Sequence, residues 1–197
     1  MINKNILFFM PSIEGGGVEK NLFIVSNYLS KKFRSVYLIT SSIKFKHKFN
    51  RKIKIICPNN LFWENFGRKS KYFICLFLLL IQFVKNKNFT VFAFQANIYC
   101  LILCKIFNVK IIVRSNSAPI GWSKNFFKNI IFKNILQLAN KTMVNSIEFN
   151  KELKKRYNIK PITIYNPLNK KEIIAKSKKK IRESFFNNKN INLINVA

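Results

Sequence analysis

The stretch ILFFMPSIEGGGVEKNLFIVSNYL, residues 6–29, decides the fold class of this chain. Residues 5–10 form a short, continuously apolar run, which is typical of a strand buried on both faces. A Gly-rich turn follows, and within residues 18–31 apolar side chains recur at helical spacing at Val18, Leu22, Val25 and Leu29. A buried strand, a tight turn and an amphipathic helix predict the first half of a βαβ unit.

The alternation of short apolar runs with longer helical patterns continues along the chain. Further strands are expected at residues 35–40, 53–57, 90–94, 110–114, 141–144 and 162–165. Helices are expected at residues 71–85, 98–107, 122–139 and from Ser146, which is a favourable N-cap residue. Buried strands that alternate with helices predict an α/β, Rossmann-like, doubly wound parallel sheet.

The 197 residues suffice for one such domain and a short extension. We expect residues 1–169 to form the Rossmann-like domain. Residues 170–182 are basic with helical potential, and residues 190–197 (NINLINVA) again have the pattern of a buried strand. We therefore expect residues 170–197 to comprise an interdomain segment and the first strand of a second domain that is missing.

The chain is strongly basic, with 36 Lys and Arg residues against seven acidic residues, all of them Glu, and a formal net charge of +29. Such a field attracts anionic lipid and nucleic acid alike. The abundance of Lys, Asn, Ile and Phe, all with A/T-rich codons, also allows compositional drift. Charge spread over the whole surface would favour drift, whereas one face carrying the basic residues of 44–54 and 68–71 would favour membrane docking.

Cysteine and histidine usage argues against a metal centre. Cys100 and Cys104 share a helical face, but the chain has one histidine, His47, and no Asp, so we expect core packing and a surface histidine. The remaining cysteines are Cys57 and Cys75, and no secretory signal precedes them. We expect a cytosolic chain with reduced thiols and no metal.

The most apolar segment, residues 72–84 (YFICLFLLLIQFV), is well short of the ~20 residues that a membrane-spanning helix needs. A core helix of a parallel-sheet protein is the favoured interpretation. A helix whose outer face rests on lipid is the alternative, because four basic residues flank the segment, namely Lys69, Lys71, Lys85 and Lys87.

Polar residues follow almost every expected strand, and the carboxyl ends of parallel strands meet at one edge where ligands bind. These candidate site residues are Gln95, Asn97, Arg114, Asn116, Asn145, Ser146 and Asn166. Loop and helix-cap chemistry accounts for several of them without a ligand. It accounts less well for Arg114 and for the three glycines at residues 15–17.

The glycines Gly15, Gly16 and Gly17 permit a tight turn, and the following helix presents N–H groups and a positive dipole end to an anion. A phosphate is the expected ligand there, although a plain tight turn is an open alternative. The turn is no dinucleotide fingerprint, because Lys20 stands where a third glycine is needed, and it is no P-loop.

Four motifs in this order resemble the N-terminal domain of family-four glycosyltransferases of the GT-B fold. They are Gly16-Gly17-Val18-Glu19 after the first strand, the cluster at residues 114–116, the step Asn145-Ser146, and Asn166-Pro167. The resemblance covers roughly residues 5–175. Residues 190–197 are similar to the first strand of that family's second domain.

The resemblance implies a retaining transfer of sugar from a nucleotide-sugar co-substrate, without another cofactor, to a lipid-linked or surface-polysaccharide acceptor. It implies that Gly15, Gly16, Gly17 and Glu19 lie near the donor phosphates and sugar. Gln95, Asn97, Arg114, Asn116, Asn145 and Ser146 would shape the acceptor site, and Asn166-Pro167 would form the interdomain hinge. The family's paired catalytic glutamates belong to the missing domain, so no catalytic residue is expected and the chain alone should be inactive.

The partners expected from this resemblance are a nucleotide-sugar donor, a lipid-linked glycan and an anionic membrane at the cytoplasmic face of the cell membrane. A non-enzymatic basic protein that binds anionic membrane or nucleic acid is the alternative. No specific nucleic-acid partner is expected, because no RNA-binding signature or aromatic-interleaved basic motif is evident.

Overall fold

The computed structural model describes residues 2–59, 61–95, 97–116 and 126–178. The chain divides into two compact units, Met1–Pro167 and Leu168–Ala197. In the second unit the structure describes one helix, α6 (Lys170–Ser177), whose N-cap Asn169 accepts a hydrogen bond from the backbone N–H of Glu172. The end of the predicted basic helix and the strand predicted at residues 190–197 lie outside the described residues.

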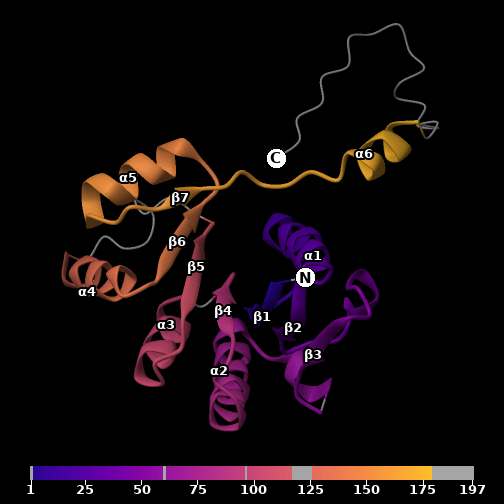
Figure 1. The fold of residues 1–197 in the computed structure, drawn as a ribbon, viewed down its shortest axis with the longest axis horizontal. Helices are drawn as coiled ribbons and strands as arrows, with labels where there is room; N and C mark the ends of the chain where they lie inside the picture. The colour runs from indigo at the N-terminus through magenta and orange to yellow at the C-terminus, as the bar shows by residue number, and fades with distance from the viewer. Residues whose placement is uncertain (1, 60, 96, 117–125, 179–197) are drawn as a thin grey trace, which may run out of the picture. The chain divides into compact units, whose positions relative to one another are not determined.

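The first unit is built on a seven-stranded sheet in which all neighbouring strands are parallel (Figure 1). The strand order is β3-β2-β1-β4-β5-β6-β7. The strands are β1 (Ile2–Phe9), β2 (Phe33–Ile39), β3 (Ile53–Ile56), β4 (Thr90–Ala93), β5 (Ile111–Ser115), β6 (Lys141–Val144) and β7 (Ile162–Thr163). The order reverses between β1 and β4, so the predicted doubly wound Rossmann-like fold is confirmed and has its switch point there.

Helices connect the strands as the alternating pattern predicts. They are α1 (Gly17–Leu29), α2 (Arg68–Lys85), α3 (Asn97–Ile106), α4 (Phe126–Gln137) and α5 (Ile147–Tyr157), with short 3-10 helices η1 (Lys46–Lys48) and η2 (Leu61–Asn65). Helix α2 begins three residues before the predicted start, and β7 ends before the predicted residue 165. Residues 122–125 of the predicted fourth helix lie outside the described part of the chain.

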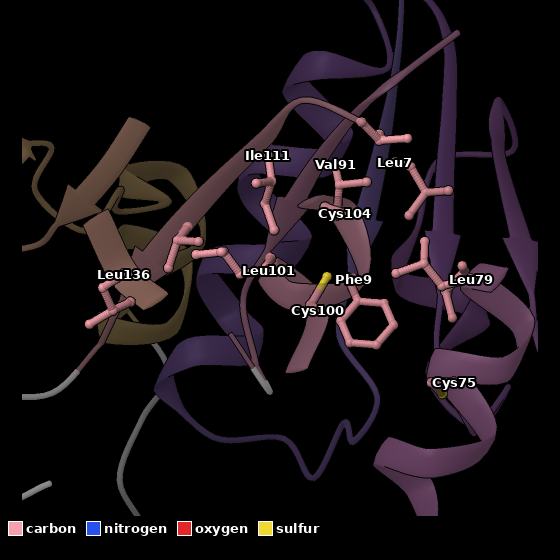
Figure 2. Packing of buried hydrophobic residues seen from close by; sticks show 14 of the residues in the cluster. Leu7, Phe9, Cys75, Leu79, Val91, Cys100, Leu101, Cys104, Ile111 and Leu136 are labelled. Atoms are coloured by element: carbon pink, nitrogen blue, oxygen red, sulfur yellow. The ribbon is translucent and has the colours of Figure 1, made fainter. Parts of the chain in front are cut away.

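Two apolar clusters fill the space on the two faces of the sheet. The larger packs α2, α3, α4 and α5 against one face, and the smaller packs α1 against the other. In the larger cluster Cys100 and Leu101 of α3 and Leu79 of α2 lie around the strand residues (Figure 2). Cys75, Cys100 and Cys104 are buried free thiols, which confirms core packing for the pair Cys100 and Cys104.

Helix α2 is a core helix on one side only. Cys75, Leu79 and Phe83 are fully buried against the sheet, whereas Phe73 and Val84 are 75% and 76% exposed. Among the described residues, no helix is long and apolar enough to cross a membrane.

Candidate functional site

Hydrogen bonds tie the carboxyl ends of the central strands into one edge, called the carboxyl edge below. At the switch point the backbone N–H of Ser12 donates to Oε1 of Gln95 at 3.0 Å, which joins the ends of β1 and β4. The side chain of Asn116 donates to the carbonyl of Phe94 at 3.0 Å, which joins the ends of β4 and β5. The edge predicted from strand-end polarity is therefore a connected structure.

Arg114 occupies the centre of the β5 end. It is 1% exposed, and its guanidinium lies over the ring of Phe94 at 5.4 Å from carbon to ring centre. Its Nε donates to Oδ1 of Asn116 at 3.1 Å, and its Nη2 donates to Oδ1 of Asn166 at 2.7 Å. Two amide oxygens, one from a residue 2 positions after Arg114 and one from a residue 52 positions after it, therefore hold one buried cation.

The charge of Arg114 is not neutralised by any carboxylate that the structure describes. Burial lowers the pKa of the guanidinium below its ordinary value, yet an arginine remains protonated at neutral pH. An unpaired buried cation is costly, and an anionic ligand would offset that cost through charge-assisted hydrogen bonds. The site is thus suited to a phosphate or a carboxylate.

A cavity of about 340 Å³ opens beside this cluster, between the sheet and the helices α3, α4 and α5. Asn97 lines it at the first position of α3, and its Nδ2 donates to the carbonyl of Arg114 at 2.8 Å. Its Oδ1 is buried and has no hydrogen-bond partner among the described residues. The remaining lining is largely apolar and includes Ile98, Phe132, Leu136 and Leu153. A ligand with hydroxyl donors would satisfy the free oxygen of Asn97.

Asn145 and Ser146 stand at the end of β6. Ser146 is the N-cap of α5, and its Oγ accepts a hydrogen bond from the backbone N–H of Phe149 at 3.1 Å. Oδ1 of Asn145 is buried without a partner in the described part of the chain. The cap explains Ser146 structurally, whereas Asn145 retains an unused acceptor.

The glycine turn lies at the end of β1 and leads into α1. Gly15 has φ of +91°, a conformation that side-chain-bearing residues rarely adopt. A Cβ on Gly16 would lie 2.9 Å from Oε2 of Glu19, whereas a Cβ on Gly17 would meet no atom within 4 Å. Glu19 is buried and its Oε1 accepts from the backbone N–H of Glu14 at 3.4 Å. The carboxylate of Glu19 therefore holds the turn, and the space where a Cβ of Gly17 would stand is open.

The glycine turn also carries an ion pair that was not predicted from the sequence. Glu14 forms a bidentate contact with Arg68 at the start of α2, with Nη2 to Oε2 at 2.7 Å and Nε to Oε1 at 3.2 Å. The Arg68 guanidinium, and next the hydroxyl of Ser12, lower the pKa of the Glu14 carboxyl to about 2. The partners are 54 residues apart in sequence, and no local sequence pattern predicts their contact.

The structure thus gathers four of the predicted residues into one cluster and leaves two groups outside it. One group is the glycine turn with Gln95, and the other is Asn145 with Ser146. Arg114, Asn116 and Asn97 form the cluster with Asn166, which joins it by a hydrogen bond in addition to its predicted hinge position. Gln95 stands at the neighbouring β4 end, toward the glycine turn. Their roles in binding stay predictions. Among the described residues, no three His, Cys, Asp or Glu side chains could hold a metal ion.

Comparison with known proteins identifies structures of similar fold. No family model matches the sequence, and no curated protein sequence matches it. Solved structures do match. Anabaena HepE, determined with UDP and glucose, has a TM-score of 0.59 and 14% identity over 84% of this chain and 45% of its own.

A glycosyltransferase from Rickettsia africae has a TM-score of 0.58 and 17% identity, over 90% of this chain and 50% of its own. Phytolacca americana UGT2, determined with UDP-2-fluoro-glucose and pterostilbene, has a TM-score of 0.58 and 9% identity over 91% and 58%. The chain therefore spans about half the length of the proteins it resembles. At these identities the similarity establishes the Rossmann-like fold.

Proposed function

We propose that this chain is the acceptor-side part of a nucleotide-sugar-dependent glycosyltransferase. The support is a fold similar to that of proteins solved with UDP or a UDP-sugar, together with a polar carboxyl edge at the switch point. The family-four assignment and a retaining mechanism follow from the motif resemblance and belong to the proposal.

The buried cation at Arg114 is the observation that carries the proposal. Its guanidinium is fixed by the neutral oxygens of Asn116 and Asn166, so its full positive charge is available to a ligand. A phosphate group accepts several such hydrogen bonds at once. In the proposed enzyme, Arg114 orients the diphosphate of a lipid-linked acceptor.

The cavity beside Arg114 fits the other parts of such an acceptor. Apolar side chains such as Phe132 and Leu136 line one part of it, and the unpaired Oδ1 of Asn97 lies near its polar part. A sugar hydroxyl that donates to Asn97 would be held at a defined distance from the charged group. Most ligand sites combine an apolar lining with a few such polar groups.

The glycine turn is the proposed contact to the donor. The N-cap of α1 is Gly16, which provides no side-chain cap, and a Cβ on Gly17 would meet no atom within 4 Å. Free N–H groups at a helix start favour a phosphate. The resemblance assigns the catalytic glutamates and nucleotide binding to a second domain. In the proposed enzyme that domain would close over this turn.

Transfer of radiolabelled glucose from UDP-glucose tests the proposal. The chain is joined to a donor-binding domain taken from a structural neighbour such as HepE, and is supplied with lipid-linked acceptors. We expect transfer only in the joined protein. Loss of the buried cation in Arg114→Gln should reduce transfer roughly tenfold or more.

Arg34→Gln is the matched control, because Arg34 is exposed and makes a single long hydrogen bond to Asn3 at 3.4 Å. A binding assay with the chain alone and a short prenyl diphosphate removes the dependence on the added domain. Equal binding by the wild type and Arg114→Gln would contradict the assignment of Arg114.

A further inference from the structure

The outer sides of α2 and α3 carry exposed apolar side chains where a surface helix ordinarily carries polar ones. These side chains, called the apolar face below, are Phe73, Phe77, Val84, Tyr99, Ile102 and Ile106. Ile106 is 71% exposed, comparable with Phe73 and Val84. Single exposed apolar residues are ordinary, but a contiguous set on neighbouring helices indicates a partner.

Helical geometry places the members of the apolar face together. At 3.6 residues per turn, positions 73, 77 and 84 form one stripe of α2, opposite to the side that buries Leu79 and Phe83. Helix α3 contacts α2, and both cover the same face of the sheet (Figure 1). The two stripes therefore point away from the sheet side by side, and a flat partner can meet both.

Charges of one sign border the apolar face. Basic side chains stand in the first turn of α2, at and just after its end, and on α3, namely Lys69, Lys71, Lys85, Lys87 and Lys105. The sequence contains no acidic residue between Glu64 and Glu148, so α2, α3 and α4 carry no negative side chain. Lysine stems can lie along apolar surface while their ammonium groups reach outward to anions.

We propose that the apolar face docks the protein on an anionic lipid surface, with α2 and α3 lying in the plane of the interface. The uncharged stretch 72–84 is about 20 Å long at 1.5 Å per residue, so it suits an in-plane position and is too short to span. Phenylalanine and isoleucine would enter the boundary between headgroups and acyl chains, and lysines at both ends would contact lipid phosphates.

Charge complementarity selects lipid over a second copy of the chain. Face-to-face pairing of two copies would bring together two bodies that each carry a net charge of +29, and would align the same lysines. An anionic bilayer offers the opposite charge and an apolar layer at the same surface. Both properties are needed to match this face.

The docked orientation would place the carboxyl edge at one end of the two docked helices. Helix α2 begins at Arg68, which contacts Glu14 after β1, and α3 begins at Asn97, which contacts the carbonyl of Arg114. Both helices thus start at the carboxyl edge, beside the proposed acceptor site. Docking itself does not depend on the proposed sugar transfer.

Co-sedimentation of the intact chain with vesicles tests this inference. Phosphatidylcholine vesicles with and without phosphatidylglycerol are compared, and we expect strong binding only to the anionic vesicles. The double variant Phe73→Ser with Phe77→Ser should lower the vesicle partition coefficient roughly tenfold or more, because two large apolar groups no longer leave water. The pair Lys85→Gln with Lys87→Gln should weaken binding to anionic vesicles as well.

Tyr28→Ser is the matched control, because Tyr28 is 59% exposed on α1, which covers the opposite face of the sheet. It should leave the partition coefficient unchanged, and circular dichroism verifies that each variant is folded. Equal losses from Tyr28→Ser and the double variant would overturn the inference. So would binding to DNA in preference to anionic vesicles at physiological salt, or a dimer in light scattering that the double variant separates.

Discussion

The Nη2 of Arg114 donates a 2.7 Å hydrogen bond to Oδ1 of Asn166, and this bond joins the end of β5 to the chain beyond β7. The two residues belong to motifs for which the family resemblance implied separate roles, an acceptor site and an interdomain hinge. The structure makes them one unit. The side chain at the end of the first compact unit helps to fix the buried cation.

Replacing Asn166 by Ala should destabilise the first unit. The variant removes one of the two amide oxygens that accept hydrogen bonds from the charged, buried guanidinium of Arg114, which costs about 1–3 kcal/mol of unfolding free energy. Urea unfolding followed by circular dichroism measures the difference. Asn3→Ala, which removes only an exposed 3.4 Å contact, should stay within experimental error. Equal stability of both variants would show that the Asn166 bond contributes nothing.

The three glycines should respond differently to Ala. At Gly15 the positive φ makes a side chain unfavourable by about 1–2 kcal/mol, so Gly15→Ala should unfold at lower urea. Gly17 begins α1 with open space around it, so Gly17→Ala should keep or raise stability by up to about 1 kcal/mol. If a donor phosphate approaches this backbone, Gly17→Ala should nevertheless lose transfer in the joined enzyme. Full transfer by this stable variant would remove the glycine turn from the donor site.

The ion pair between Glu14 and Arg68 should make the glycine turn sensitive to acid. Because the pKa of Glu14 falls from an ordinary 4.5 to about 2, its stabilising effect is complete above pH 4.5 and is lost as the pH falls toward 2. The stability difference between the wild type and Glu14→Gln should shrink over that window. The pair is exposed, so the difference should be small and weaken with salt.

Carbon-13 NMR titration of the Glu14 carboxyl measures this pKa directly. In Arg68→Gln it should move back toward 4.5, because the largest cause of the shift is removed. An unchanged titration in that variant would mean that Ser12 and the turn, rather than Arg68, hold the carboxylate.

Two neighbouring positions on α2 should separate its buried and exposed sides. Leu79→Ala removes a fully buried side chain and should cost about 2–5 kcal/mol. Phe77→Ala removes a half-exposed one on the outer side and should change stability by no more than about 0.5 kcal/mol. Thermal and urea unfolding of the two variants, compared under one set of conditions, decide the orientation of the helix.

The sheet could be predicted from the sequence because its signals are local. Each buried strand of a parallel sheet is a short apolar run, and each crossover helix repeats its apolar residues at a different period. The parallel direction then implies that residues such as Gln95, Asn116 and Asn145 stand at one edge. That inference needs the direction of the strands and no knowledge of distant contacts.

The contacts that organise the edge depend on tertiary structure, and no local pattern contains them. Glu14 follows β1 and contacts Arg68 at the start of α2. Asn166 follows β7 and contacts Arg114 at the end of β5, so both contacts depend on how distant elements are placed in the fold. The orientation of α2 was likewise hidden. In a segment that is apolar on every side, the spacing of the apolar residues does not indicate which side is buried.

The position of β1 in the sheet affects how the protein folds during its synthesis on the ribosome. Strand β1 ends at Phe9 and lies between β2 and β4, yet β4 begins only at Thr90. At a synthesis rate of about 5–20 residues per second, the first strand waits on the order of seconds for its second neighbour. Throughout that interval one edge of β1 has no neighbouring strand. Chaperones that shield apolar segments of nascent chains should therefore raise the yield of folded protein.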